Sequence, residues 1–303
     1  MSETVYHIPA LLEPTLQGLD IRRDGIYMDA TLGGAGHTRA ILDRLGPDGR
    51  LFSFDQDIEA IERAPRDPRL TTIHANFKYI ANFADYYGIL GKVDGILADL
   101  GVSFHHFDEA SRGFSFRADG PLDMRMNTEA KVSAADIIAE ADIDELTRIF
   151  RIYGELKQAR RIADRIVAVR AGKAVDTTAA LAELVRPVLN PAREKKELAQ
   201  VFQALRIQVN NEMEVLEQFL AHSLSVLKPG GYLSIITYHS LEDRMVKNFM
   251  RTGTTSGKEE KDFFGRATSP LKPTTNKPVV PDEAEIEANP RSRSAKLRTA
   301  EKL

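Results

Sequence analysis

The stretch that decides the fold is residues 26–37, which read IYMDATLGGAGH. Its first residues form a short apolar run typical of a buried strand, and the segment from His37 onward has helical periodicity. Between them lie Gly33, Gly34 and Gly36, which allow the backbone to approach a ligand closely at the carboxyl edge of a sheet. The segment therefore predicts a strand, a glycine-rich ligand-binding turn and a helix, with a tight turn that binds nothing as the alternative.

From this stretch onward, short apolar strand patterns alternate with helical patterns as far as residue 100. The pattern predicts strands at 26–30, 51–54, 71–75 and 93–100, and helices at 37–45 and 58–64. Strands that alternate with helices in this way form a parallel sheet with right-handed crossovers. The first part of the chain is therefore expected to have an α/β fold.

A helical block interrupts this pattern, because residues 131–227 have helical periodicity and no convincing strand. The sheet then resumes with a strand at 232–238, followed by a helix that Ser240 is expected to cap. An arm with little periodicity follows at 253–290, and residues 298–303 are expected to form a closing edge strand. We expect two domains, one of residues 1–108 and 212–303 and the other an inserted, mainly helical domain of residues 109–211.

The composition of the chain excludes several classes of protein. Its 303 residues are 43 % hydrophobic and carry a formal net charge of only −3, so the chain can bury a sizeable core. It has no cysteine, which excludes disulfides, iron–sulfur clusters and thiolate zinc sites. The first residues lack the pattern of a signal peptide, and no run of about 18 apolar residues occurs. We therefore expect a cytoplasmic protein without a membrane span.

Positive charge is concentrated in two segments. Residues 148–173 carry eight basic and two acidic side chains, a net charge of +6, and residues 289–303 carry five and one, a net charge of +4. The other 262 residues therefore carry −13. Basic segments on an acidic body can direct a polyanion to one surface. The alternative for residues 148–173 is the solvated face of an amphipathic helix.

The residues around the glycine loop discriminate among nucleotide ligands. A dinucleotide fingerprint would need a small residue where Arg39 stands, and Asp29 would repel a pyrophosphate. Asp55 and Asp99 end the second and fourth strands, so both carboxylates are expected at the ligand-binding edge. S-adenosylmethionine has no phosphate and carries a sulfonium and an ammonium group, so such a site suits it. The sequence lacks the GxxxxGK[ST] pattern of P-loop nucleotide hydrolases.

Ordered motifs extend over the rest of the chain. They are DLGVS at 99–103, RGFSF at 112–116, DGPLDMRM at 119–126, FQALRI at 202–207, HSLEDR at 239–244 and NPRSRSAKLR at 289–298. Together they resemble the bacterial 16S rRNA cytosine-N4 methyltransferase family, RsmH/MraW. The resemblance implies a class I S-adenosylmethionine-dependent methyltransferase, with a Rossmann-like, mostly parallel sheet and an inserted helical domain. The implied reaction is methylation of the exocyclic N4 of a decoding-centre cytidine in 16S rRNA within the small (30S) ribosomal subunit.

For the cofactor, the resemblance implies contacts from the loop, from strand ends and from the segment after Asp99. The expected residues are Gly33, Gly34, Ala35, Gly36, His37, Asp55 on the ribose, Phe77 beside the adenine, Asp99 and His106. Ala35 stands where the family usually has glycine, so its backbone is expected not to need a conformation that favours glycine. No metal ion is expected at residues 105–108, because no partner with ligand spacing accompanies them.

For catalysis, the amino nitrogen of cytosine is a weak nucleophile because its lone pair is delocalised into the ring. We expect Asp99 to accept hydrogen bonds from this amino group. His239 is expected either to approach the base or to have a structural role before the following helix. Phe114 is expected either to stack on an unpaired base or to pack in the core. The expected RNA-binding residues are Arg112, Phe114, Arg160, Arg161, Arg206, Arg291 and Arg293.

Other functions stay open at this point. A methyltransferase of a protein or a small molecule is disfavoured by the +6 segment. A ribosome-assembly factor that binds S-adenosylmethionine without catalysis is disfavoured by the intact Asp55 and Asp99. A nicotinamide-dependent oxidoreductase is disfavoured by Arg39 and Asp29, for the reasons given above.

Overall fold

The computed structural model describes residues 9–101, 109–259, 263–264 and 268–303. The chain divides into two compact units. The first comprises residues 1–101 together with 214–303, and we call it the sheet unit. The second comprises residues 102–213, and we call it the helical unit. A single excursion of the chain between the fourth and fifth strands therefore forms the whole helical unit.

The sheet unit contains a seven-stranded sheet in the order β3-β2-β1-β4-β5-β7-β6. The strands are β1 (Ile26–Asp29), β2 (Arg50–Asp55), β3 (Leu70–His74), β4 (Val93–Asp99), β5 (Leu227–Thr237), β6 (Leu271–Pro273) and β7 (Lys296–Lys302). Strands β1 to β5 pair in parallel, whereas β7 is antiparallel to both β5 and β6. The predicted Rossmann-like class I methyltransferase fold is confirmed.

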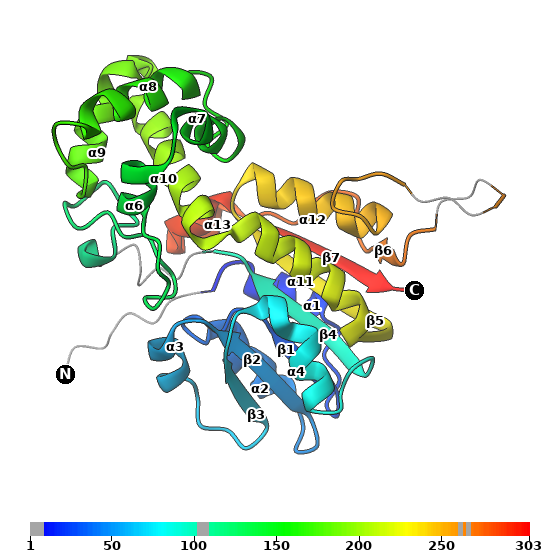
Figure 1. Ribbon diagram of the computed structural model, residues 1–303. Helices are drawn as coiled ribbons and strands as arrows, with labels where there is room; N and C mark the ends of the chain where they lie inside the picture. The colour runs from blue at the N-terminus through cyan, green and yellow to red at the C-terminus, as the bar shows by residue number, and fades with distance from the viewer. Residues whose placement is uncertain (1–8, 102–108, 260–262, 265–267) are drawn as a thin grey trace. The chain divides into compact units, whose positions relative to one another are not determined.

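Helices cover both faces of this sheet (Figure 1). They are α1 (Leu12–Gly18), α2 (Gly36–Arg44), α3 (Ile58–Glu62), α4 (Ile80–Tyr86), α11 (Glu212–Val226), α12 (Ser240–Thr252) and α13 (Glu283–Ala288). The central strands read as continuous apolar runs because both of their faces are buried. Tyr27, Phe52 and Leu97, from three neighbouring strands, are each at most 1 % exposed.

The helical unit packs its helices around a core of its own (Figure 1). They are α6 (Ala134–Glu140), α7 (Ile143–Ile152), α8 (Ala159–Arg170), α9 (Thr178–Val185) and α10 (Glu194–Asn210). On α8, Ala159, Ile162, Ala163 and Ile166 are all buried, which is the helical spacing seen in the sequence. Among the described residues of this unit no strand occurs, only an isolated bridge between Pro121 and Thr177.

Two local predictions about the end of the chain were wrong. Residues 298–303 were expected to form an edge strand, but β7 lies between β5 and β6, and the arm itself supplies the edge strand β6. The helix after β5 was expected to be capped by Ser240, but His239 is its N-cap and accepts a hydrogen bond from the backbone N–H of Glu242. Both errors concern contacts that local sequence patterns do not determine.

No helix of the part of the chain that the structure describes is both long enough and apolar enough to cross a membrane.

Candidate active site

The glycine loop leaves the carboxyl end of β1 and is tied to the neighbouring strand β2. The amide of Leu32 donates to the carbonyl of Phe54 at 2.8 Å, and the amide of Gly33 donates to Oδ2 of Asp55 at 2.8 Å. Gly33 has φ +48°, a left-handed conformation that favours glycine. The structure thus places the predicted loop beside the predicted carboxylate, at the sheet edge where open α/β folds bind ligands.

Ala35 is the N-cap of α2, and its backbone contradicts the expectation from sequence. Its φ of 61° and ψ of 20° lie in the left-handed region, which costs an L-residue about 1–2 kcal/mol. The side chain is only 2 % exposed, so burial of its methyl group offsets part of this cost. The side chain of Ala35 cannot accept a hydrogen bond, so it does not cap the amides of the first turn of α2.

Asp55 ends β2 and accepts two backbone hydrogen bonds, one on each carboxylate oxygen. Oδ2 accepts from Gly33, and Oδ1 accepts from the amide of Asp57 at 2.9 Å. Burial raises the pKa of Asp55, and these two amides oppose the rise. A carboxylate oxygen has two lone pairs, so each oxygen can accept one more hydrogen bond, as a ribose diol would require.

Phe77 lies beyond the end of the next strand, β3, in a short 3-10 helix (Phe77–Tyr79). Asn76 caps this turn by accepting from the amide of Lys78 at 2.9 Å. The ring of Phe77 is partly buried and makes an edge-to-face contact with Phe219, with 5.1 Å between centroids. The contact fixes the ring on the same sheet edge as Asp55, where an adenine is expected.

Beneath the loop lies a buried polar network around Asp29, the last residue of β1. Asp29 is 1 % exposed and accepts from the hydroxyl of Thr38 at 2.7 Å and from the amide of Thr31 at 3.1 Å. Thr38 also contacts the hydroxyl of Ser53 at 2.9 Å. Burial raises the pKa of Asp29. These hydrogen bonds hold the loop to β1 and β2, and sequence reasoning missed Thr31 and Thr38 as members of the site.

Asp99 ends β4 beside the same loop. Its amide donates to Oγ1 of Thr31 at 2.7 Å, and this hydrogen bond joins the end of β4 to the loop after β1. Burial raises the pKa of Asp99 to about 6. Its Oδ1 atom is buried and has no hydrogen-bond partner among the described residues. A buried acceptor without a donor is costly, so this oxygen is suited to a donor supplied by a ligand.

His37 approaches Asp99 but does not act as its donor. Its Nε2 lies 3.2 Å from the carbonyl of Ala10, so that nitrogen carries the ring proton. Burial lowers the pKa of His37, which keeps the imidazole neutral. Its Nδ1, 3.8 Å from Oδ2 of Asp99, is then an acceptor. The ring is 5 % exposed, so any contact of His37 with a cofactor falls to its backbone.

The site therefore fits S-adenosylmethionine. Three carboxylates, from Asp29, Asp55 and Asp99, lie at one edge of the sheet, which disfavours phosphates and favours a cationic ligand. The N-terminus of α2, nine residues long and without a side-chain cap, offers backbone donors for a carboxylate. His106, the remaining predicted cofactor contact, lies outside the described residues.

His239, predicted as catalytic or structural, caps a helix in the structure. It is the N-cap of α12, and its Nε2 lies 3.1 Å from Oε1 of Glu242. The other carboxylate oxygen of Glu242 accepts from the amide of Tyr238 at 3.0 Å. The His239 side chain is 9 % exposed, and its Nδ1 takes part in the capping box. Its Nε2 is buried without a hydrogen-bond partner among the described residues.

Three predicted RNA contacts lie inside the helical unit instead. The ring of Phe114 is 4 % exposed within the core, so the prediction that it stacks on a base was wrong and the core alternative holds. Arg112 donates to the carbonyls of Arg125 and Met126, at 2.9 and 3.2 Å. Arg206 forms a two-pronged ion pair with Glu212 at 2.8 and 2.9 Å. These internal partners favour structural roles for Arg112 and Arg206.

The other predicted RNA contacts are exposed. On the helical unit, Arg160 and Arg161 lie on the outer face of α8. In the sheet unit, Arg291 and Arg293 are exposed in a short 3-10 helix (Pro290–Ser294). These four side chains remain candidates for contacts with a polyanion.

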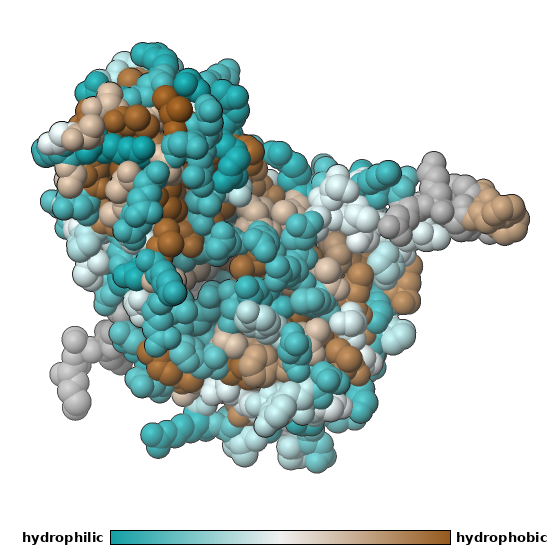
Figure 2. Space-filling view, in the orientation of Figure 1, coloured by the Kyte–Doolittle hydropathy of each residue, from teal (hydrophilic) through white to brown (hydrophobic). Residues whose placement is uncertain are grey.

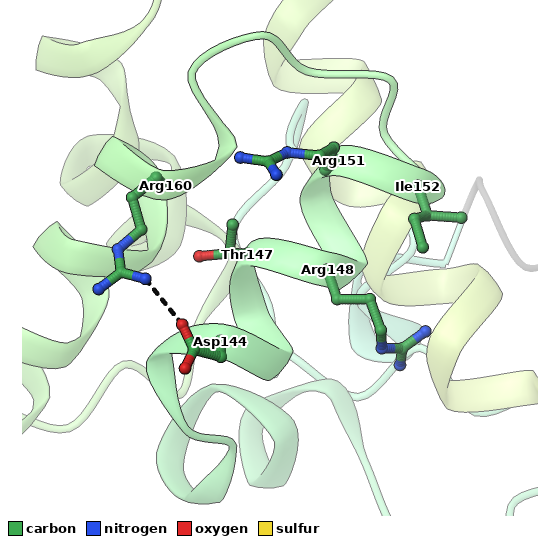
Figure 3. A pocket seen from close by; sticks show the side chains of 6 residues that line it. All are labelled: Asp144, Thr147, Arg148, Arg151, Ile152 and Arg160. Carbon is green, nitrogen blue, oxygen red and sulfur yellow. Dashed lines mark hydrogen bonds and ion pairs between the residues drawn. The ribbon is translucent and has the colours of Figure 1, made fainter.

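A cavity of about 530 Å³ opens on the helical unit between α7 and α8 (Figure 3). Its lining residues are Asp144, Thr147, Arg148, Arg151, Ile152 and Arg160. Arg160 pairs with Asp144 at 2.7 Å and with Asp164 at 3.2 Å. Arg148 extends away from Arg151 and Arg160 (Figure 3). With three arginines and one aspartate, the lining carries a net charge of +2.

Comparison with known proteins identifies the family of the chain. Residues 4–303 match the model of the MraW methylase family. The chain is 55 % identical to the ribosomal RNA small subunit methyltransferase H of Parabacteroides distasonis over 301 residues, covering 99 % of both chains. It is 56 % identical to the protein of that name from Bacteroides thetaiotaomicron, over 99 % of this chain and 98 % of that one. The chain therefore belongs to the MraW methylase family, and the resemblance drawn from its motifs is confirmed.

Proposed function

We propose that this protein transfers a methyl group from S-adenosylmethionine to the exocyclic N4 of cytosine 1402 in 16S rRNA. The observation that carries the proposal is the buried Oδ1 of Asp99 at the ligand-binding edge, which has no hydrogen-bond partner among the described residues, because an exocyclic amine is a hydrogen-bond donor. The relatives are named ribosomal RNA small subunit methyltransferase H, which supports rRNA as the class of substrate. From the same function we infer that the protein is cytoplasmic.

The sheet unit would hold the cofactor with residues already described. Asp55 would accept hydrogen bonds from the ribose hydroxyls, and the ring of Phe77 would lie against the adenine. The first amides of α2, together with Gly33, Gly34 and Gly36, would hold the carboxylate of the methionine part. When bound, S-adenosylmethionine supplies an electrophilic methyl group on a positively charged sulfur.

Asp99 would act on the amino group of the base. Oδ1 would accept one N–H, which orients the nitrogen lone pair toward the methyl carbon. In the transfer, the nitrogen–carbon bond forms as the carbon–sulfur bond breaks, and the nitrogen loses one proton. With a pKa of about 6, Asp99 is ionised at neutral pH and can accept this proton before water removes it. Methyl transfer from a sulfonium is strongly downhill, so positioning supplies most of the help that the reaction needs.

We also propose that the inserted domain of residues 109–211, which lies within the helical unit, recognises the RNA. Arg148, Arg151 and Arg160 line its cavity, and Arg161 is exposed beside it. The ion pairs of Arg160 are exposed, and such pairs contribute little, so a phosphate can replace Asp144 as the partner. Hydrophilic side chains cover much of this unit on the face in Figure 2. Recognition of a decoding-centre base favours the folded small subunit over naked RNA as the substrate.

The reaction is tested with isotopically labelled S-adenosylmethionine and small ribosomal subunits that lack the methyl group. Nucleoside mass spectrometry should find the label in N4-methylcytidine, and the Asp99→Ala protein should leave the subunits unlabelled. Label in another nucleoside or in ribosomal protein, or near-normal turnover by Asp99→Ala, would contradict the proposal. Cofactor binding without transfer would indicate an assembly factor instead.

The RNA surface is tested with the double variant Arg160→Glu/Arg161→Glu. Binding to small subunits should weaken, and the slope of log K against log salt should fall by about one for each lost phosphate contact. The control Arg63→Glu/Arg66→Glu makes the same charge change on exposed residues of the sheet unit. If both double variants bind equally, the charge of the whole chain and not the helical unit determines binding.

A further inference from the structure

A short segment near the N-terminus, residues 9–11, lies against the first turn of α2. We call it the N-terminal segment. A Cβ atom at Gly36 would be 2.9 Å from Cγ of Pro9, so the glycine allows this segment to pack directly on the helix. The carbonyl of Ala10 accepts a hydrogen bond from Nε2 of His37 at 3.2 Å. The N-terminal segment therefore contacts the first two residues of α2, where the carboxylate of the cofactor is expected.

Leu11, the last residue of the N-terminal segment, is held by three sets of contacts. Its side chain is 1 % exposed, in a cluster with Ile236 and Leu297. Its carbonyl accepts from the amide and the hydroxyl of Thr15, at 2.9 and 2.7 Å. Its amide donates to Oε1 of Glu285 at 2.6 Å. The last contact joins the N-terminal segment to α13, across 274 residues of sequence.

The backbone of Leu11 depends on such support. Its φ of 52° and ψ of 37° lie in the left-handed region, which is unfavourable for a residue with a side chain. A hydrogen bond to a carboxylate is stronger than one to a neutral acceptor. Glu285 is itself fixed, because it is partly buried and its amide donates to Oδ1 of Asp282 at 2.8 Å. Glu285 therefore stabilises the conformation of Leu11 in which the preceding residues lie against α2.

We propose that Glu285 is a positioning residue for cofactor binding, which acts through the amide of Leu11 and the N-terminal segment on the first turn of α2. This inference rests on the part of the proposed function that places the cofactor carboxylate at the first amides of α2. Asp55 and Phe77, the expected contacts of the adenosine part, lie at the end of β2 and beyond β3. Loss of the Glu285 contact should therefore weaken the binding of the carboxylate and spare the binding of the adenosine part.

The first test measures the binding of two ligands by isothermal titration. S-adenosylhomocysteine carries the amino-acid carboxylate, whereas 5′-methylthioadenosine lacks it and keeps the adenosine and the sulfur. Glu285→Ala should bind S-adenosylhomocysteine about tenfold more weakly than wild type, and 5′-methylthioadenosine within about twofold. Glu285→Gln keeps an oxygen that can accept from the Leu11 amide, so this variant should lose only about threefold.

The matched control is Glu287→Ala, which removes an exposed carboxylate from the same helix. It should bind both ligands within about twofold of wild type. Unchanged binding of S-adenosylhomocysteine by Glu285→Ala would overturn the proposal. Equal weakening of both ligands by Glu285→Ala would also overturn it, because a general loss of stability does not distinguish a ligand with the carboxylate from one without it.

The second test uses the wild-type chain, so it needs no variant to fold. Coupling between two sites is reciprocal, so a bound cofactor must in turn stabilise the contact between Glu285 and Leu11. S-adenosylhomocysteine should therefore slow hydrogen exchange in α13 at least about threefold, and saturating 5′-methylthioadenosine should slow it less. The measurement is mass spectrometry of peptides that contain residues 283–288. Exchange in α13 that does not change with S-adenosylhomocysteine would contradict the proposal.

These tests separate the inference from the proposed function. Neither test measures methyl transfer, so a failure of the assigned rRNA reaction would leave both results unaffected. If wild type binds the two ligands equally tightly, the placement of the carboxylate at α2 fails, and the inference fails with it. If wild type prefers S-adenosylhomocysteine and Glu285→Ala keeps the same preference, the role of Glu285 alone is rejected.

Discussion

Asp55→Asn is the sharpest test of the cofactor site, because both oxygens of this carboxylate accept backbone amides. Oδ2 accepts from Gly33 at 2.8 Å and Oδ1 accepts from Asp57 at 2.9 Å. Asparagine has only one acceptor oxygen, and its NH₂ group would face one of these two amides. The variant must therefore lose one hydrogen bond that shapes the loop, and it also loses the charged acceptor for the ribose.

The size of the effect follows from these contacts. A hydrogen bond to a charged group contributes about 1.5–3 kcal/mol. Taking about 2 kcal/mol for the net loss, the affinity for the cofactor should fall roughly 30-fold, since each 1.4 kcal/mol is a factor of ten. The fold itself should be retained, because Asp55 is partly exposed at the strand end and lies outside the apolar core.

The assay is isothermal titration with S-adenosylhomocysteine, which binds without turnover. Asp57→Asn is the matched control, since it removes the same charge two residues away. Oδ1 of Asp57 accepts from the amide of Glu59 at 2.9 Å, and the side-chain oxygen of asparagine can accept the same hydrogen bond. We expect the control to bind within about threefold of wild type. Equal weakening by both variants would show a general charge effect and refute the reasoning, as would an unchanged affinity of Asp55→Asn.

Two further predictions concern stability. Gly113→Ala should cost at least about 3 kcal/mol of stability, because φ is +70° and the added Cβ would lie 2.1 Å from the carbonyl oxygen of Pro121. Gly88→Ala, at φ +66° with no atom within 4 Å, should cost only about 1 kcal/mol. Similar losses of stability in urea unfolding would disprove the steric argument. Asp243→Asn should lose about 2 kcal/mol at pH 7, because it breaks the 2.7 Å ion pair with Arg298. Burial opposes ionisation of Asp243, but Arg298 outweighs it and holds the pKa below its usual range, so the stability difference should be complete above about pH 5 and shrink as the pH falls below about 4. A difference that does not change with pH would contradict this pairing.

The strands of the sheet unit could be predicted because each is a short apolar run bounded by turn residues. The predicted strand at 93–100, for example, is β4 at Val93–Asp99. Contacts between segments distant in sequence could not be predicted in this way. Residues 298–303 have the pattern of an edge strand, yet β6 pairs with β7 and makes it an interior strand. Pairing of this kind depends on tertiary contacts and leaves little local signal.

The same division holds for the site. Asp55 and Asp99 were predicted because the ends of parallel strands meet at one edge. Thr31 acts through the neighbouring strand, so only the register of β4 beside β1 connects it with Asp99. For Phe114, an aromatic residue beside arginines suits both a base-stacking surface and a core, and only burial distinguishes the two.

The place of β7 has a consequence for the synthesis of the chain. Residues 296–302 are made after every other described strand, and among the described strands β6 pairs only with β7. A chain that stops before Lys296 thus lacks one strand and leaves a second without its partner. It also exposes the edge of β5, an open edge of the kind that promotes aggregation. All residues of the helical unit precede Glu214, so at about 5–20 residues per second they are complete roughly 5–20 s before the sheet can close.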